Sequence, residues 1–267
     1  MLLKFARKIK GFVLYRLMPP HNMFTHPAEK YYYQQYNHHI SGYFERGKTL
    51  LDVGCQMGRF TIPAAIAGMH VTATDIRTSY FKFISKQINN RGNIDFRHET
   101  LEKSLAELEN QRFDVVMCLE LLYNLPDQEN NFRALAGLVK PGGVLITSHR
   151  TTGYYLYRFI REKKYCEANM ILVGNHPCYN AQTPAELINW CSKSGLELLK
   201  IVPIGIFSGF GSDAFSGIAN PIKLNQQQSA GLSKMEHNAD LQKMFLNNAR
   251  YNLLIAVKKP DPSGIEQ

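Results

Sequence analysis

The chain has 267 residues, of which 45% are hydrophobic and 20% are charged, as in an ordinary globular protein. No apolar run approaches the roughly 18–20 residues of a membrane span, which excludes an integral membrane protein, and an aromatic content of 11% excludes a disordered chain. The net charge of +9 favours acidic partners such as nucleic acid, anionic lipid or phosphorylated substrates, or simply reflects a basic proteome.

The five cysteines are Cys55, Cys118, Cys166, Cys178 and Cys191. Their number is odd, the chain is long and no C-x-x-C spacing occurs, which argues against a disulfide framework or a zinc knuckle. A reducing compartment fits this pattern better, so we expect a cytoplasmic protein.

Residues 1–18 combine five basic residues with apolar residues at a nearly helical period, and Pro19 and Pro20 then end the pattern. This predicts a basic amphipathic helix that either lies on an anionic membrane surface or packs over the edge of the domain. We assign residues 1–46 to a helical N-terminal extension with a second helix over residues 27–44. The tyrosines of residues 31–36 form either a packing face or an aromatic wall for a cation.

From residue 48 onward, short apolar strands alternate with helices of about ten residues. The predicted strands are residues 50–53, 70–75, 93–97, 113–118, 144–148, 196–202 and 250–257. The predicted helices are residues 57–67, 78–90, 101–109, 128–140 and 184–194, with Thr78 or Ser79, Asp127 and Thr183 as candidate N-caps. Such alternation indicates an α/β fold, a doubly wound and mostly parallel seven-stranded sheet over residues 47–259, followed by a tail over residues 260–267.

Two stretches fall outside this alternation, at about residues 150–182 and 203–247. We expect both to be lids or binding loops, because unstructured connections of this length are rare in a compact domain. The second contains three consecutive glutamines at residues 226–228, which suggests a mobile surface segment.

The first strand runs into the turn Asp52-Val53-Gly54-Cys55-Gln56-Met57-Gly58, and the second strand ends in Asp75, 21 residues after Gly54. A glycine lets the backbone turn tightly and approach a ligand, and a carboxylate at the end of the second strand can accept hydrogen bonds from ribose hydroxyls. A nicotinamide dinucleotide site would need G-x-G-x-x-G, but Gln56 replaces the second glycine and would crowd a pyrophosphate.

The chain resembles the class I S-adenosylmethionine-dependent methyltransferases in four segments. They are the glycine turn, the T-D pair, F-D-V-V-M-C-L-E and L-V-K-P-G-G-V-L-I-T. The resemblance implies S-adenosyl-L-methionine as the cofactor, with its methionine end held by the loop from Asp52 to Gly58. It also implies that Asp75 and Ile76 border the ribose. The other cofactor-binding residues that it implies are Thr100 and Leu101 beside the adenine, and Cys118 and Leu119 under the methionine moiety.

The chain is more narrowly similar to the ubiquinone-biosynthesis O-methyltransferases, in residues 94–102, 118–127 and 174–187 and in its last strand. Metal-using members of that family carry Glu-His where this chain has Tyr123 and Asn124, so that only Glu120 of their ligand set remains. We therefore predict that no metal is bound.

Removing the proton of a hydroxyl acceptor usually needs a base with a pKa near 7, which favours histidine. His149 follows the fifth strand, where the acceptor is expected, and His176 lies in the first insertion. Glu120 is either an acceptor-orienting carboxylate or a residue at the edge of the core. These three are the candidate catalytic residues.

We therefore expect a methyltransferase, an O-methyltransferase acting on an aromatic, isoprenoid or other lipid-like small molecule. One alternative is an RNA or protein methyltransferase, although the chain lacks an RNA-binding module and an N-P-P-Y-like motif for flipped bases, which argues against nucleic acid. Another is a non-catalytic partner with the methyltransferase fold.

Overall fold

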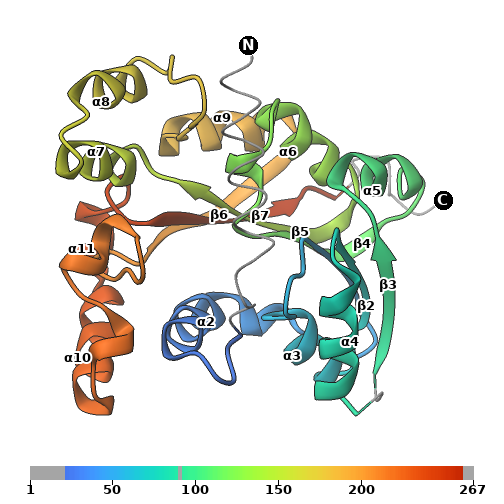
Figure 1. Ribbon diagram of the computed structural model, residues 1–267. Coiled ribbons are helices and arrows are strands. Elements are labelled where there is room, and N and C mark those ends of the chain that lie inside the picture. The colour runs from blue at the N-terminus through green and yellow to red at the C-terminus, as the bar shows by residue number, and fades with distance from the viewer. Residues whose placement is uncertain (1–21, 90–91, 261–267) are drawn as a thin grey trace.

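Seven strands form one sheet in the computed structural model, which describes residues 22–89 and 92–260 (Figure 1). The strands are β1 Thr49–Val53, β2 His70–Asp75, β3 Asn93–His98, β4 Phe113–Cys118, β5 Val139–Arg150, β6 Leu196–Ile204 and β7 Tyr251–Lys258. Each corresponds to a strand predicted from the sequence. The amphipathic helix predicted over residues 1–18 lies outside the described residues.

The strand order is β3-β2-β1-β4-β5-β7-β6, and the order reverses between β1 and β4. β1 pairs in parallel with both β2 and β4, so the carboxyl ends of these three strands meet at one edge of the sheet. β7 is antiparallel to both of its neighbours, β5 and β6. The expected mostly parallel, doubly wound α/β sheet is confirmed.

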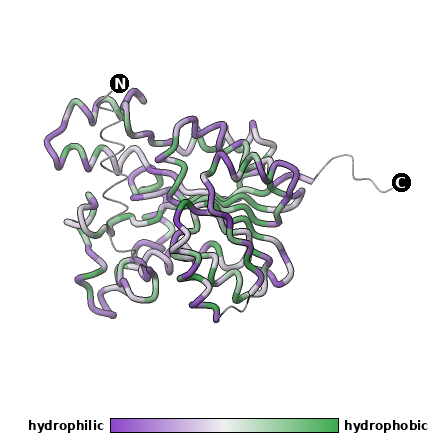
Figure 2. Tube along the Cα trace, turned by 45° about the vertical axis from the view of Figure 1, so that its right-hand side comes forward, coloured by the Kyte–Doolittle hydropathy of each residue, from purple (hydrophilic) through white to green (hydrophobic). Residues whose placement is uncertain are grey.

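Helices cover both faces of the sheet, as Figure 1 shows. One face carries α2 Pro27–Ile40, which continues into the short η1 Ser41–Tyr43, together with α3 Thr61–Ile66 and α4 Thr78–Gln87. The other carries α5 Leu101–Glu107, α6 Gln128–Gly137 and α9 Pro184–Lys193. Two hydrophobic clusters fill the layers between sheet and helices, and the hydrophobic central strands are visible in Figure 2.

The aromatic face of α2 belongs to the first of these clusters. Tyr31, Tyr32 and Tyr36 are buried there, and the ring of Tyr36 meets Phe60 edge to face. The packing interpretation of the tyrosine cluster is therefore what the structure shows. No helix within residues 22–89 and 92–260 is both long and apolar enough to cross a membrane.

One helix start and one N-cap differ from the sequence-based prediction, and the expected N-cap Asp127 makes no capping bond. The first crossover helix begins at Thr61 and not near Met57, because Gln56 and Gly58 have positive φ values that a right-handed helix does not allow. Thr78 is the first residue of α4, after an N-cap that makes no side-chain bond. Asp127 is the N-cap of α6 in a left-handed conformation, and its carboxylate accepts from Asn130 Nδ2 and not from the helix backbone. Thr183 forms the predicted capping box with Glu186.

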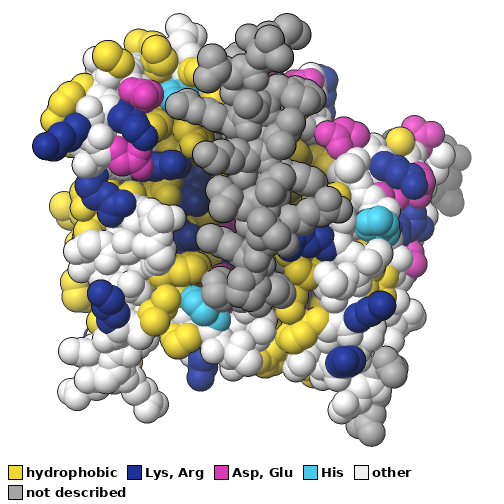
Figure 3. Space-filling model, in the orientation of Figure 1, with side chains coloured by type: hydrophobic (Ala, Val, Ile, Leu, Met, Phe, Trp, Pro, Cys, Tyr) yellow, Lys and Arg dark blue, Asp and Glu magenta, His cyan; other side chains and the backbone are white. Residues whose placement is uncertain are grey.

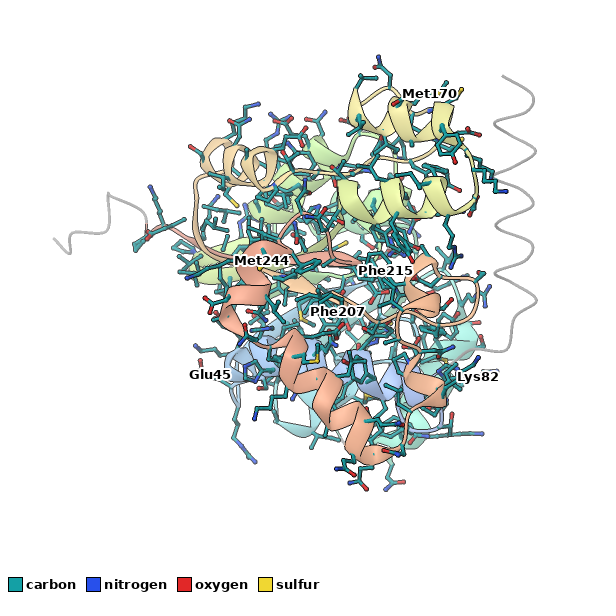
Figure 4. All side chains as sticks on the ribbon, turned by 90° about the vertical axis from the view of Figure 1, so that its left-hand side faces the viewer. Glu45, Lys82, Met170, Phe207, Phe215 and Met244 are labelled. Atoms are coloured by element: carbon teal, nitrogen blue, oxygen red, sulfur yellow. The ribbon has the colours of Figure 1, made fainter. Side chains whose placement is uncertain are left out.

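Both insertions are largely helical. The first contains α7 Thr152–Arg161 and α8 Tyr165–Leu172, which enclose a third hydrophobic cluster that is rich in tyrosine and phenylalanine. The second contains η3 Ala214–Gly217, η4 Pro221–Lys223, α10 Gln226–Glu236 and α11 Ala239–Met244. Figure 4 looks onto this side, with α10 running below the labelled Phe207 and Met170 of α8 at the opposite end.

The three glutamines at residues 226–228 form the first turn of α10, where Asn225 and Gln228 make a capping box. The expectation of a mobile segment there is replaced by a docked helix. The buried carboxylate of Glu236 at the end of α10 accepts from Tyr31 Oη at 2.7 Å, from Gln35 Nε2, and from the backbone of Phe207 at 2.7 Å. Glu236 thus joins the second insertion to α2.

Candidate active site

The turn after β1 reverses the chain at the carboxyl edge of the sheet. Gly54 has φ 73°, and a Cβ at this position would lie 3.0 Å from Leu121 Cδ2. At Gly58 (φ 76°) a Cβ would lie 2.7 Å from Ile84 Cγ1. Gly54 thus keeps the turn open beside the η2 segment (Leu122–Asn124), whereas Gly58 allows the chain to pack against α4.

Two buried carboxylates flank this turn. Asp52, at the end of β1, accepts a hydrogen bond of 2.6 Å from Thr61 Oγ1, and burial raises its pKa to about 6. Asp75, at the end of β2, accepts from the backbone N–H groups of Gln56 and Arg77 at 3.0 Å each, while its burial raises its pKa. Each carboxylate oxygen has two lone pairs, so Asp75 can still accept hydrogen bonds from hydroxyl groups.

A pocket lies between the β1 turn and the segment that follows β4. It encloses about 30 Å³ and is lined by Asp52, Gly54, Cys55, Gln56, Arg59, Phe60, Leu119 and Glu120. That volume holds about two water molecules. Arg59 crosses the pocket and forms ion pairs with Glu120 on one side, at 2.7 Å, and with Glu29 of α2 on the other, at 2.5 Å.

Glu120 is the polar residue that links this pocket to the rest of the site. Its φ of 56° turns the chain after β4, and its backbone N–H donates to Ser148 Oγ at 2.6 Å. Besides Arg59, its carboxylate accepts from Tyr251 Oη at 3.0 Å, and Tyr251 Oη in turn lies 3.2 Å from Tyr123 Oη. Burial alone would raise the pKa of Glu120, but the positive charge of Arg59 and two further arginines lowers it to about 2. Glu120 is therefore a fixed anion.

The remaining residues implied by the resemblance lie along the same edge. Leu119 lines the pocket, and Cys118 is fully buried beneath it, where burial raises the pKa of its thiol. Ile76 is 43% exposed just after β2. Thr100 is the N-cap of α5, and Leu101 is buried in the first turn of that helix. These residues surround the carboxyl ends of β1, β2 and β4, where ligands of open α/β sheets bind.

His149 lies at the carboxyl end of β5, as expected, but its side chain is on the face of the sheet away from Glu120. Its ring is fully buried between Phe132 of α6 and Trp190 of α9, and its Nε2 hydrogen-bonds Thr147 Oγ1 at 2.8 Å. Successive residues of a strand face opposite sides, so Ser148 contacts Glu120 while His149 enters the opposite layer. Burial lowers the pKa of His149 to about 4. Its position thus differs from the expected one beside the acceptor.

His176 lies in the first insertion, as expected, but its role there is local. Its Nδ1 accepts the backbone N–H groups of Cys178 and Tyr179 at 3.1 Å each, and its ring stacks on Phe159 with a centroid distance of 5.2 Å. His176 therefore shapes the turn after α8 and extends the aromatic cluster of the insertion.

The pocket residues fit S-adenosylmethionine. The turn at Gly54 has no Cβ to block a close approach, and the carboxylates of Asp52 and Asp75 can accept from ammonium and hydroxyl groups. Sequence reasoning missed Arg59 and Tyr251. A basic residue directly after the glycine turn was the available signal for Arg59, whereas the contact of Tyr251 with Glu120 depends on the sheet order.

A larger hollow, about 340 Å³, opens at the amino ends of the same strands, beside Thr49, His70, Asn93 and Phe113. It lies at the opposite edge from the glycine turn, so we do not take it as the active site. Within residues 22–89 and 92–260, no three histidine, cysteine or acidic side chains are grouped as metal ligands. All five cysteines are free thiols.

Proteins of similar sequence carry the names of methyltransferases. A ubiquinone biosynthesis O-methyltransferase from Coxiella burnetii (strain RSA 331 / Henzerling II) is 31% identical over 161 residues, covering 60% of this chain and 68% of that protein. The enzyme of the same name from Azotobacter vinelandii (strain DJ / ATCC BAA-1303) is 35% identical over 159 residues, covering 58% of this chain and 67% of that protein.

Solved structures share the fold. Magnesium protoporphyrin IX methyltransferase from Synechocystis PCC 6803, with bound SAH, superimposes with a TM-score of 0.56 at 16% identity, over 97% of this chain and 98% of that one. The N-methyltransferase NodS from Bradyrhizobium japonicum WM9, with S-adenosyl-L-homocysteine, gives a TM-score of 0.52 at 15% identity, over 89% and 90% of the two chains.

The family described as "Methyltransferase domain" matches residues 24–201, most of the chain, and this match spans α2, the glycine turn, Asp75 and Glu120. Together with the fold and the pocket, it makes S-adenosylmethionine the cofactor. The chain belongs to the class I S-adenosylmethionine-dependent methyltransferases.

Proposed function

We propose that this methyltransferase transfers a methyl group to a hydroxyl oxygen of an aromatic or isoprenoid, lipid-like small molecule. The observation that carries the proposal is the chain of hydrogen bonds from Glu120 through Tyr251 to Tyr123, at the rim of the cofactor pocket. Such a chain can orient a hydroxyl acceptor. The names of the relatives, ubiquinone biosynthesis O-methyltransferases, support the same chemistry.

The cofactor supplies an activated methyl group bound to a positively charged sulfur. The protein then has to hold the two reactants in line and exclude water. Asp52 and Asp75 hold the cofactor, Arg59 fixes Glu120, and Glu120 with its tyrosine partners orients the acceptor. The aromatic cluster of α7 and α8 forms an apolar cover for a lipid-like substrate.

We further propose that positioning, and not a strong general base, accounts for most of the catalysis. An efficient base has a pKa near the working pH, whereas the pKa of Glu120 is about 2. The imidazole of His149 is neutral at pH 7 but enclosed by α6 and α9. An acidic phenol, which loses its proton easily, suits such a site.

The alternatives from the sequence are less well supported. An RNA or protein methyltransferase is not favoured, because the relatives carry the names of small-molecule enzymes. A non-catalytic partner protein would not need the ordered chain of Glu120, Tyr251 and Tyr123 beside an intact glycine turn.

For the cellular location, we propose a cytoplasmic protein that contacts anionic membranes through residues 1–18. The basic residues of that segment should each contribute about 1 kcal/mol near such a surface. Co-sedimentation with phosphatidylglycerol vesicles at low and high salt tests this, with a chain starting at Pro20 as control. Equal binding of the two chains would contradict the proposal.

The function is tested by incubating the purified protein with S-adenosylmethionine that carries a tritiated methyl group. The acceptors are a lipid extract, total RNA and a protein lysate, each supplied separately. We expect label in the organic phase of the lipid reaction and a product with the mass and fragmentation of a methyl ether. Label confined to RNA or protein would refute the proposal, as would cofactor binding without transfer to any acceptor. Asp75→Ala serves as the cofactor-binding control.

A further inference from the structure

Arg150, the last residue of β5, is enclosed by three tyrosine rings. Its guanidinium carbon lies 4.0 Å from the ring centroid of Tyr251, 4.1 Å from that of Tyr154 and 5.1 Å from that of Tyr123. Aromatic faces attract a guanidinium, so the three rings hold its position without using its N–H groups. We name this group the Arg150 cage.

The hydrogen-bond donors of Arg150 are largely unused. An arginine has five N–H donors, and in the described part of the chain Arg150 makes one hydrogen bond, a long one of 3.3 Å from Nη1 to the backbone oxygen of Arg250. Its neighbours differ in this respect, because Arg59 pairs with Glu29 and Glu120 while Arg250 pairs with Asp213 at 2.9 Å. Arg150 is partly buried, and it forms no salt bridge with a carboxylate among residues 22–89 and 92–260.

The nearest carboxylates are committed elsewhere. Glu120 accepts from Tyr251 Oη, and Asp213 accepts from Tyr154 Oη at 3.1 Å, so two rings of the cage place their hydroxyls on these acids and their faces on Arg150. Arg150 therefore makes no direct ion pair with either acid in the described part of the chain, although its charge contributes to the low pKa of Glu120. A cation held in this way keeps its planar set of donors available for an anion from outside.

The cage lies on the acceptor side of the site. Tyr251 joins it to Glu120, which lines the cofactor pocket, and Tyr154 joins it to the aromatic cluster of the first insertion. Figure 3 shows basic side chains, in dark blue, on this face beside the atoms drawn in grey. The ring of Tyr251 thus contacts Arg150, while its hydroxyl contacts a carboxylate that lines the pocket.

We propose that the methyl acceptor carries a carboxylate and that Arg150 binds it. The proposal rests on the proposed methyltransferase function and specifies its substrate class, a hydroxylated aromatic carboxylate. One guanidinium matches one negative charge, whereas a phosphate dianion would need a second free cation and Arg250 is already paired. The tyrosine rings that surround the cation offer flat, apolar walls to the ring that bears the carboxylate.

The test compares two probes of the same size, 3,4-dihydroxybenzoate and its neutral analogue 3,4-dihydroxybenzamide. Their binding to the full chain saturated with S-adenosylhomocysteine is measured by calorimetry. We expect the carboxylate to bind about 10-fold or more tightly than the amide, as a charge-assisted contact implies. In Arg150→Gln the preference should fall below about 2-fold, while Arg150→Lys should keep part of it. In all three proteins the affinity for S-adenosylhomocysteine itself should stay the same.

Arg158→Gln is the matched control, because Arg158 also lies over aromatic rings but pairs with Glu162. It should keep the full preference. Three results would overturn the proposal: no preference for the carboxylate in the unmodified protein, an unchanged preference in Arg150→Gln, or a loss of S-adenosylhomocysteine binding in a folded Arg150→Gln, which would assign the arginine to the cofactor. A protein that binds no S-adenosylhomocysteine would instead refute the methyltransferase function.

Discussion

Replacing Gln56 by glycine should tighten cofactor binding without loss of stability. Gln56 has φ 46°, a left-handed conformation in which a residue with a Cβ is strained by about 1 kcal/mol, and its side chain lines the pocket. Glycine relieves that strain but adds roughly 0.5–1 kcal/mol of entropy to the unfolded chain. The two effects nearly cancel, so we expect the free energy of unfolding to change by less than about 0.5 kcal/mol.

The gain should appear in binding. Keeping a long polar side chain in one conformation beside a ligand costs up to about 1.5 kcal/mol of rotamer entropy. Removing it should raise the affinity for S-adenosylhomocysteine roughly 3- to 10-fold, as measured by calorimetry, with urea unfolding in parallel.

Gln56→Ala separates the two causes, because alanine removes the side chain but keeps the Cβ and its strain. It should recover the gain in affinity but be less stable than the glycine variant. A glycine variant that binds more weakly than the unmodified protein would refute this reasoning, because the side chain of Gln56 would then be a cofactor ligand and not an obstacle.

Four further predictions concern the same site. Asp75→Ala should weaken S-adenosylmethionine binding by about 1.5–3 kcal/mol in calorimetry, and an unchanged affinity would remove Asp75 from the site. The pKa of Glu120 is about 2 in the folded protein and near 4.3 in the unfolded chain. The ionised carboxylate therefore stabilises the folded protein above about pH 4.3, and this contribution is lost as the pH falls toward 2. In urea unfolding between pH 6 and 3, Glu120→Gln should therefore lose less stability than the unmodified protein does, whereas Glu45→Gln, at an exposed ion pair, should behave like the unmodified protein. His149→Asn should keep near-normal turnover but lower the melting temperature. A roughly 10²-fold loss of turnover in the folded variant would contradict this and would show that His149 is the catalytic base. Turnover should survive EDTA, and a collapse that magnesium reverses would show that a metal is needed.

The sheet and its main helices follow from signals that are local in sequence. β2 and β4 have the bounds that the sequence predicts, because short apolar runs between turn residues encode buried strands. Thr183 caps α9 because its partner Glu186 lies three residues away in the same segment. In the second insertion the capping box of Asn225 and Gln228 is a local signal for the start of α10, but no local signal gives the place where that helix docks. α10 is held by contacts of Glu236 with Tyr31 and Gln35, which lie about 200 residues earlier in the chain.

The site residues that belong to sequence motifs could be predicted. The contacts that depend on how the strands and side chains are arranged in the folded protein could not. Asp52, Gly54 and Asp75 lie at the expected edge, since the carboxyl ends of neighbouring parallel strands meet. The alternation of a strand cannot say which of its faces a residue takes, so Ser148 and not His149 reaches Glu120. Arg150 forms no salt bridge with a carboxylate in the described part of the chain, because the tyrosines beside it bind Asp213 and Glu120 through their hydroxyl groups. A sequence does not show such contacts.

The place of β7 between β5 and β6 has a consequence for synthesis of the chain. β7 leaves the ribosome after the other six strands of this sheet, yet it supplies the hydrogen-bonding neighbour of both β5 and β6. Until residue 258 emerges, β6 has no partner in the sheet and β5 has an open edge, which is the form of strand that pairs with other molecules. Tyr251, at the start of β7, also completes the contacts of Glu120 and the Arg150 cage. A nascent chain that stalls before Tyr251 would therefore carry an intact glycine turn but an unfinished sheet and an unfinished acceptor side.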